Sequence, residues 1–285
     1  MKPKVLVVGS SNTDMVVQMP RLPAPGETGL GGEFVVAAGG KGANQAVAAA
    51  RLGAQVTFVA RIGTDMLGDQ SLQNFAADGL VTDFIVRESA QPSGVALIMV
   101  GGGGENMIAV ASGANGQLVP SDVAQAEDAL KEASVLLLQL EIPMPVVRYS
   151  AETAREAGLT VILNPAPAQD LDEGLLKRIS VLTPNATETK ILTGILPTDE
   201  ESAARAAKRL FEQGVATVVI TLGERGAFFA GKNEAGLVPG RSVRAIDTTA
   251  AGDAFNGALA VALASERSLE QAVEFANQAA AMSVT

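Results

Sequence analysis

Short runs of Val, Ile and Leu alternate along the chain with longer Ala-rich stretches, and this alternation restricts the possible folds more than any other feature. Strands that are buried on both faces are continuously apolar, whereas the helices that cover them are amphipathic. The pattern therefore predicts an α/β fold, a three-layer αβα sandwich with a mostly parallel central sheet. We expect strands at residues 4–9, 56–61, 135–140, 160–164, 181–184 and 217–222. We expect helices at residues 42–52, 66–78, 121–132, 144–157, 186–193, 200–213, 252–264 and 269–282.

Two segments, residues 15–38 and 93–111, depart from this pattern. The first contains three prolines, and the second alternates aliphatic residues around the glycines at 101–104. Such features are typical of edge strands and turns. We expect both segments to form antiparallel strands of a small β-sheet at the edge of the main sheet, which would act as a lid. No linker-like stretch separates two folding units, so residues 1–285 are expected to form a single domain.

The composition excludes several classes of protein. Without Cys or His, the chain has no disulfide, no thiol nucleophile, no imidazole metal site and no Ser-His-Asp triad. Acid-base chemistry is therefore left to Asp, Glu, Lys or Tyr149. A net charge of −10 has the wrong sign for nucleic acid as a partner. No signal peptide or apolar run of about 18 residues is present, so we expect no membrane association and a cytoplasmic protein.

Polar residues follow the predicted strands, where ligands of open α/β sheets bind. Asn12 and Asp14 come after the first strand, and they suit the vicinal hydroxyls of a polyol. The alternative for this pair is a simple Asx turn. Glu141 follows the strand at 135–140, where it would either face a cleft or solvate a turn.

A glycine-rich motif, Gly39-Gly40-Lys41-Gly42-Ala43-Asn44, precedes the first Ala-rich helix. Its glycines permit close approach of a ligand to the backbone, and the helix N-terminus offers free N–H groups. The motif is not a Walker A loop, because Val35 and Gly42 stand where that pattern needs Gly and Ser or Thr. The alternative is an ordinary loop that caps a helix.

Two further motifs have plausible structural explanations. Asn185 and Glu188 share one face of a first helical turn, where they could reach hydrated Mg²⁺ or phosphate oxygens. Their spacing alone favours a capping box. The segment from Thr221 to Gly226, which includes Gly223, follows a strand and would let a nucleotide lie on bare backbone. The alternative for this segment is a hairpin turn.

The motif at residues 247–258 carries the strongest functional signal. Ala250, Ala251 and Gly252 open a helix with small side chains, so their backbone N–H groups could form an anion hole. Asp253 follows in the same turn, where it could accept a proton from an attacking hydroxyl during phosphoryl transfer. The alternative, an acid favoured by the helix dipole, explains Asp253 but not the small residues before it.

The glycine-rich motif at 39–44 and the motif at 247–253 together resemble the two signatures of the ribokinase-like (phosphofructokinase-B type) carbohydrate kinases. The resemblance extends over the whole chain and implies ATP-dependent phosphorylation of D-ribose at its 5-hydroxyl, with Asp253 as general base and the anion hole at 250–252. It implies a sugar site formed by Asn12, Asp14, Gly40, Lys41, Asn44, Glu141 and Asp253. It implies nucleotide contacts from Asn185, Thr221, Gly223, Gly226 and Asn277. It also implies Mg²⁺ held through water by Glu188, and an activating K⁺ held by Asp247 and Thr249.

The same resemblance implies a homodimer formed through the lid. Members of the family normally continue beyond the position of Thr285 through a Gly-rich turn and a helix, so this chain is expected to be truncated at its C-terminal end. The alternatives in substrate are deoxyribose, fructose or a nucleoside such as adenosine. The alternative in function is a sugar-binding protein without catalysis. A dehydrogenase is a weaker alternative, because Gly-x-Gly-x-x-Gly is missing after the first strand.

Overall fold

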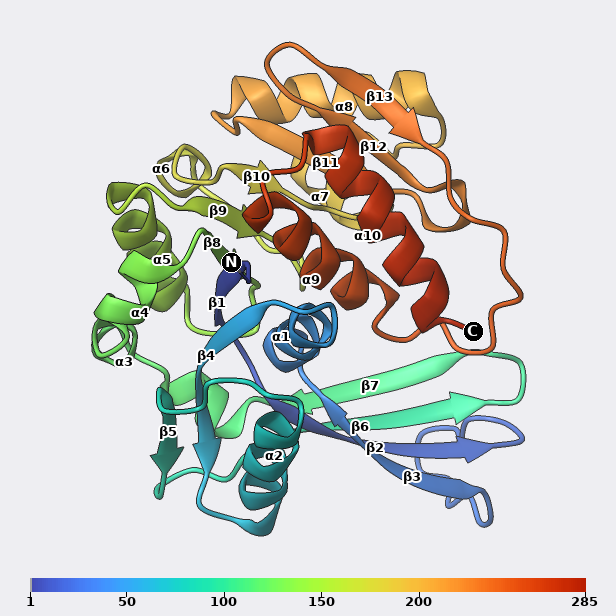
Figure 1. The fold of residues 1–285 in the computed structure, drawn as a ribbon. Helices are drawn as coiled ribbons and strands as arrows, with labels where there is room; N and C mark the ends of the chain where they lie inside the picture. The colour runs from blue at the N-terminus through green and yellow to red at the C-terminus, as the bar shows by residue number, and fades with distance from the viewer. Residues whose placement is uncertain (1) are drawn as a thin grey trace.

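The computed structural model describes residues 2–285. A nine-stranded sheet forms the centre, in the order β13-β12-β11-β10-β9-β8-β1-β4-β5 (Figure 1). Its strands are β1 (Lys4–Val8), β4 (Gln55–Gly63), β5 (Ile85–Glu88), β8 (Val135–Leu138), β9 (Thr160–Leu163), β10 (Val181–Leu182), β11 (Thr217–Thr221), β12 (Ala227–Ala230) and β13 (Ala235–Val238). All pairs from β5 to β11 are parallel, and β12 and β13 extend the edge in antiparallel fashion. The expected αβα fold is confirmed.

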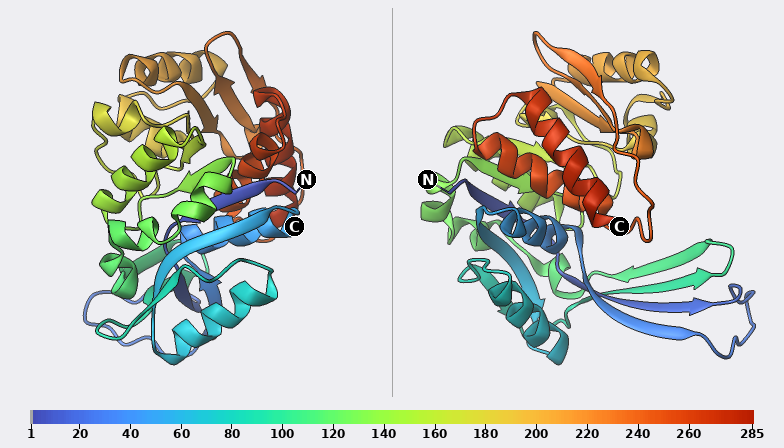
Figure 2. Two further views of the ribbon diagram at one scale, coloured as in Figure 1. Left: turned by 60° about the vertical axis from the view of Figure 1, so that its left-hand side comes forward. Right: turned by 45° about the vertical axis from the view of Figure 1, so that its right-hand side comes forward.

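Helices cover both faces of this sheet (Figures 1 and 2). The helices are α1 (Lys41–Arg51), α2 (Met66–Ala77), α3 (Pro120–Ala124), α4 (Glu127–Glu132), α5 (Met144–Glu156), α6 (Glu173–Leu176), α7 (Ala186–Thr193), α8 (Glu200–Glu212), α9 (Ala251–Ala264) and α10 (Leu269–Ser283). Alternate residues of β1 face opposite layers: Val5 and Val7 pack with α1, α9 and α10, whereas Leu6 and Val8 pack toward α5 and α8. The continuous apolar sequence of each strand is needed because both of its faces are buried.

The lid is a separate four-stranded sheet in the order β3-β2-β6-β7, and it projects from the body of the molecule (Figure 2). Its strands are β2 (Asn12–Met19), β3 (Glu33–Gly39), β6 (Gly94–Gly101) and β7 (Asn106–Ala111). Each excursion forms an antiparallel hairpin as expected, but β2 and β6 pair in parallel, which joins the two hairpins. The antiparallel pairing within each segment is confirmed, whereas the parallel pairing between the two hairpins was not anticipated.

Other expectations need correction. The helix expected at residues 121–132 is interrupted after Ala124, because two anchors hold its halves: Asp122 of α3 pairs with Arg61, and Leu130 of α4 is buried in the core. The antiparallel edge strands β12 and β13, the strand β5 and the short helix α6 were not anticipated. Within residues 2–285, no helix is long and apolar enough to cross a membrane.

Candidate active site

The carboxyl ends of the parallel strands lie beside the N-termini of α1, α7 and α9, and a small polar cavity of about 210 Å³ lies among them. This is where the topology of an open α/β sheet places a ligand. The cavity is lined by Lys41, Asn164, Ala166, Thr183, Asn185, Glu188, Thr221, Thr248, Ala250, Ala251, Gly252, Asp253 and Asn256. The fold therefore brings together residues from four of the motifs singled out in the sequence.

Glycines at the start of α1 allow the chain to approach three neighbours closely. A Cβ at Gly39 would lie 2.2 Å from the Asp14 carboxylate, so this position must stay open for that side chain. Gly40 has a φ of 90°, and a Cβ there would meet the backbone N of Asn12 at 2.7 Å. A Cβ at Gly42 would lie 2.5 Å from Ser10 N. The motif thus packs α1 directly against the strand β1 and the base of the lid.

Asn12 and Asp14 belong to the lid strand β2 and not to a turn, so the Asx-turn alternative was wrong. They alternate with Thr13, so both side chains point to the same face of the lid. The Asn12 side chain is held by Asn115, whose Nδ2 donates to Asn12 Oδ1 over 2.8 Å. With its oxygen engaged in this way, Asn12 keeps its own amide N–H groups available. Its neighbours Asn115 and Glu141 line a second cavity of about 470 Å³ next to the first.

Helix α9 begins with the backbone geometry of an anion site. Its N-cap residue Ala250 has a φ of 58°, in the left-handed region that is strained for a residue with a Cβ. The first N–H groups of a helix lack acceptors within it, and Ala251 and Gly252 at this end line the cavity. Of these two, Ala251 N donates to the Thr248 carbonyl over 3.3 Å. A Cβ at Gly252 would meet no protein atom within 4 Å. The protein's own packing therefore does not require glycine there, whereas a ligand close to the backbone would.

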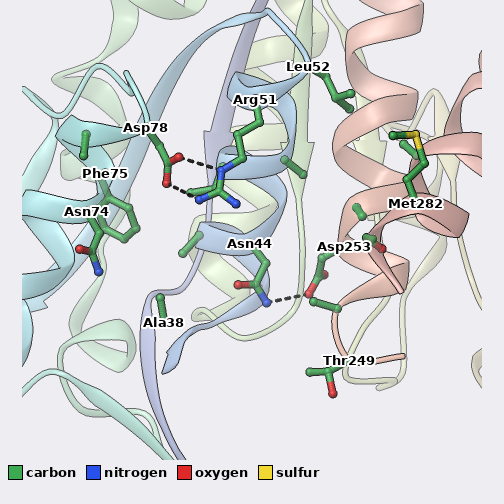
Figure 3. A pocket seen from close by; sticks show the side chains of 18 residues that line it. Ala38, Asn44, Arg51, Leu52, Asn74, Phe75, Asp78, Thr249, Asp253 and Met282 are labelled. Carbon is green, nitrogen blue, oxygen red and sulfur yellow. Dashed lines mark hydrogen bonds and ion pairs between the residues drawn. The ribbon is translucent and has the colours of Figure 1, made fainter. Parts of the chain in front are cut away.

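The Asp253 carboxylate is buried in the first turn of α9 and is held by two amides of α1. Asn44 Nδ2 donates to Oδ2 over 3.0 Å, and Gln45 Nε2 donates to Oδ1 over 2.9 Å (Figure 3 shows the first of these bonds). Burial raises the pKa of Asp253, and the nearby Glu141 carboxylate adds to this, while the Lys41 ammonium and the two amides oppose it. Such a carboxyl is both fixed in position and made more basic than an exposed one.

Two more carboxyl groups face the same centre. Burial raises the pKa of Asp14, and the carboxylates of Glu141 and Asp253 raise it further. Burial also raises the pKa of Glu188, with a smaller contribution from Asp253, while Lys41 lowers it. Asp253 therefore lies near the carboxyl groups of Asp14, Glu141 and Glu188, and the Lys41 ammonium lies near Asp253 and Glu188.

Asn185 and Glu188 form the capping box that their spacing favours. Asn185 Oδ1 accepts from Glu188 N, and Glu188 Oε2 accepts from Asn185 N, both over 2.8 Å. The box also turns the buried Glu188 carboxylate toward the polar cavity. No group of three or more Asp and Glu side chains within residues 2–285 could hold a metal on its own. A single carboxylate in a polar cavity nevertheless suits Mg²⁺, which usually keeps its waters and binds together with substrate phosphates.

The sequence signature of the pfkB family of carbohydrate kinases matches residues 2–285. The chain belongs to the pfkB family. A ribokinase of Haemophilus influenzae is 46% identical over 285 residues, which cover 100% of this chain and 93% of that protein. A deoxyribokinase of Salmonella typhi is 37% identical over 283 residues, which cover 99% of this chain and 92% of that protein. The structure of an Arabidopsis thaliana ribokinase complexed with ribose and ATP has a TM-score of 0.91 at 34% identity and covers 100% of this chain and 93% of that chain.

Family membership confirms the resemblance inferred from the two motifs and makes the chain a carbohydrate kinase. In this pfkB fold Asn12 and Glu141 line the cavity of about 470 Å³, and the cavity of about 210 Å³ is lined by Lys41, Asn185, Glu188, Thr221, Asp253 and the 250–252 segment. Asn44 donates to Asp253, and Asp14 lies close enough to Glu141 and Asp253 for both carboxylates to raise its pKa. Gly40 contributes backbone at the base of the lid.

Other predicted residues lie outside these cavities of the pfkB fold. Gly223 and Gly226 belong to the hairpin between β11 and β12, as the alternative interpretation held. Asn277 of α10 donates to the Val238 carbonyl over 3.1 Å beside a separate cavity of about 370 Å³. Asp247 is exposed, and its Oδ1 accepts from Thr249 N over 2.8 Å. Hydrogen bonds from the Thr249 side chain and from this N–H group lower the pKa of Asp247.

Three buried amides of this pfkB kinase were missed by sequence reasoning. Gln45 touches Asp253, Gln139 touches Gln45, and Asn115 holds Asn12. Gln45 could have been noticed, because a glutamine stands in an otherwise small and apolar helix directly after the glycine motif. Gln139 and Asn115 carry no comparable signal.

A third cavity, of about 810 Å³, opens between α1, α2, α9 and α10, with Asn44 and Asp253 on its wall (Figure 3). Opposite them lie Phe75 and the ion pair between Arg51 and Asp78. The Asp253 carboxylate can therefore be approached from more than one side.

Proposed function

We propose that this pfkB-family kinase transfers the γ-phosphoryl group of ATP to the 5-hydroxyl of D-ribose. The observation that carries the proposal is the buried Asp253 carboxylate, which adjoins both the polar side chains of the lid and the open backbone at Gly252. This arrangement offers a base for a hydroxyl on one side and N–H donors for a phosphoryl group on the other. The ribokinases among the relatives support ribose as the acceptor.

On the sugar side, Asn12, Asp14, Lys41, Asn44, Glu141 and the backbone at Gly40 would bind the hydroxyl groups of ribose. Asp14 lies on the lid above the glycine motif, and its carboxylate can accept two hydrogen bonds from adjacent hydroxyls. Glu141 Oε2 accepts from Ser10 Oγ and Lys41 N, which orients the carboxylate and leaves its other oxygen for the sugar. Asp253 would take the proton of the 5-hydroxyl as its oxygen attacks phosphorus.

On the phosphate side, the N–H groups of Ala250, Ala251 and Gly252 would stabilise the charge on the transferring phosphoryl group. Glu188 would hold Mg²⁺ through water, and the ion would supply charge neutralisation to the nucleotide phosphates. Asn185 and Thr221 line the same cavity and would contact the phosphates. The Lys41 ammonium contributes positive charge between the two substrates.

The remaining nucleotide and cation residues lie outside the two polar cavities. The hairpin at Gly223 and Gly226 and the cavity beside Asn277 would border the nucleoside. The Asp247 carboxylate, together with Thr249, would bind an activating K⁺ close to the start of α9. The low pKa of Asp247 keeps this carboxylate charged, as a cation ligand requires.

The lid would also form a homodimer interface. Strand register places Val36, Leu97 and Met107 on the lid face opposite to Asp14, and Phe34 lies on that face as well. All four side chains are at least half exposed. An apolar face of this kind in one protein copy is best covered by the same face of a second copy.

The deciding experiment measures ADP release by the chain with ATP, Mg²⁺ and K⁺ and with ribose, deoxyribose, fructose or adenosine. Turnover that is fastest with ribose supports the proposal. Faster turnover with deoxyribose would favour the activity of the 37% identical deoxyribokinase. Sugar binding without ADP release, measured by calorimetry, would instead indicate a sugar-binding protein.

A further inference from the structure

Gln45 is an unusual residue for its position. It lies in α1 with no exposed surface, and its side chain makes three hydrogen bonds. Nε2 donates to Asp253 Oδ1 over 2.9 Å and to Asn164 Oδ1 over 3.1 Å, and Oε1 accepts from Gln139 Nε2 over 2.7 Å. Both polar atoms of this amide are therefore engaged, and one of its partners is the proposed catalytic base.

The direction of these hydrogen bonds is fixed by the main chain. Asn164 Nδ2 donates to the Thr183 carbonyl over 3.1 Å, and a carbonyl can only accept. Asn164 must therefore turn its oxygen toward Gln45, and the Gln45 NH₂ group must donate to this oxygen. The same NH₂ group then faces Asp253, so the orientation of Gln45 does not depend on the protonation of Asp253.

Gln139 is the third hydrogen-bond partner of Gln45. Its Nε2 donates to Gln45, and its Oε1 is buried without a hydrogen-bond partner among residues 2–285. Reversing the Gln139 amide would place two oxygens against each other. Gln139 therefore presents a donor to Gln45 Oε1, which leaves the Gln45 NH₂ group directed at Asp253 and Asn164.

We propose that Gln45, oriented by Asn164 and Gln139, is a positioning residue that keeps Asp253 ionised and aimed into the cavity. The inference rests on the proposed function for its catalytic meaning. An NH₂ group directed at Oδ1 stabilises the carboxylate and offers no acceptor to a protonated Asp253. Burial and the Glu141 carboxylate oppose the ionisation of Asp253, while Lys41 favours it. The Asp253 carboxylate in turn raises the pKa of Asp14 and of Glu188. Gln45 thus adds a hydrogen-bond donor that stabilises the Asp253 carboxylate among neighbouring carboxylates.

The test replaces Gln45 and Gln139 separately by Met, which keeps the side-chain length but removes the hydrogen bonds. The pKa of Asp253 is read from the ¹³C carboxyl resonance of Asp-labelled protein, assigned by its absence in Asp253→Asn. We expect Gln45→Met to raise this pKa by about one unit, since a hydrogen bond to a charged group contributes that much. Gln139→Met leaves Gln45 in place and should give a smaller shift in the same direction. This measurement needs no substrate. If Gln45→Met folds poorly, the shift in Gln139→Met alone tests the inference.

Kinetics provide the second readout. In both variants the acid limb of kcat/KM for ribose should move to higher pH by the same amount as the pKa of Asp253 measured by NMR. We also expect a lower kcat at neutral pH and little change in KM. Ser150→Ala is the matched control, because Ser150 is also a buried, unpartnered polar side chain but lies on α5 in the other helix layer. An unmoved Asp253 resonance in every Met variant that folds would overturn the inference. Absence of turnover in the wild-type protein, with a normal NMR shift, would overturn the proposed function alone.

Discussion

Asn44 Nδ2 lies 3.0 Å from Asp253 Oδ2, and this hydrogen bond joins the first turn of α1 to the first turn of α9. The two residues are 209 positions apart in the sequence, yet each stands in one of the two motifs that resemble family signatures. The contact explains why the motifs occur together: one supplies donors and sugar-binding groups, and the other supplies the base and the anion site.

Replacing Asp253 by Asn tests the proposed base. We expect kcat to fall by about 10²- to 10⁴-fold, the usual contribution of general-base catalysis, because the amide cannot accept the hydroxyl proton. Ribose affinity should change little, as measured by calorimetry without nucleotide. A kcat within a factor of a few of the wild type would rule out this role for Asp253.

Replacing Asp14 by Asn should weaken ribose binding and stabilise the folded protein. Loss of a charged acceptor is expected to raise KM for ribose by roughly 10-fold or more. Because the pKa of Asp14 is raised in the folded protein, ionisation of Asp14 destabilises the fold as the pH rises above the ordinary Asp range. The variant should therefore have a higher Tm than the wild type at pH 7, and this difference should vanish at pH values where Asp14 is protonated in both states. An equal or lower Tm at pH 7 would contradict the electrostatic argument.

Gly252→Ala and Gly42→Ala form a matched pair. A Cβ at Gly252 meets no protein atom within 4 Å, so this variant should fold with an unchanged or slightly higher Tm. It should lose about 10-fold or more in kcat, because the methyl group obstructs one anion-hole contact. A Cβ at Gly42 would lie 2.5 Å from Ser10 N, so this variant should unfold at clearly lower temperature. Full activity of Gly252→Ala would argue against phosphate binding at this turn.

The pH profile should report the environment of Asp253. Because burial raises its pKa, kcat/KM should begin to fall on the acid side at a pH above that of an ordinary Asp carboxyl. Lys41→Met removes the cation that opposes this effect, and it should move the acid limb to still higher pH. An acid limb that stays in place in Lys41→Met would show that Lys41 does not face an ionised Asp253 during catalysis.

The lid interface is tested by Phe34→Asp, which places a charge on the apolar face opposite to Asp14. The wild-type protein should elute as a dimer in light-scattering chromatography, and the variant as a monomer. Val243→Asp is a suitable control, because Val243 is exposed on the loop before α9 and lies outside the lid. A monomeric wild type would refute the proposed dimer.

The fold class and the two motifs can be recognised from the amino-acid sequence alone. Continuous apolar strands and amphipathic helices are local patterns, and so are the glycines at 39–42 and the small residues before Asp253. Local pattern also favoured the capping box of Asn185 and Glu188, because both partners lie within one helical turn. Such features depend on neighbouring residues only, which is why they can be read without the fold.

The pairing of distant segments becomes visible only in the folded protein. The parallel pairing of β2 with β6 joins two hairpins, and it sets Asn12 and Asp14 on the lid face that carries the sugar-side groups. The link from Gln139 through Gln45 to Asp253 connects positions 94 and 208 residues apart. Strand register and long-range hydrogen bonds are established when the layers pack against each other. The residues next to a buried amide in the sequence do not identify its hydrogen-bond partner in a distant segment.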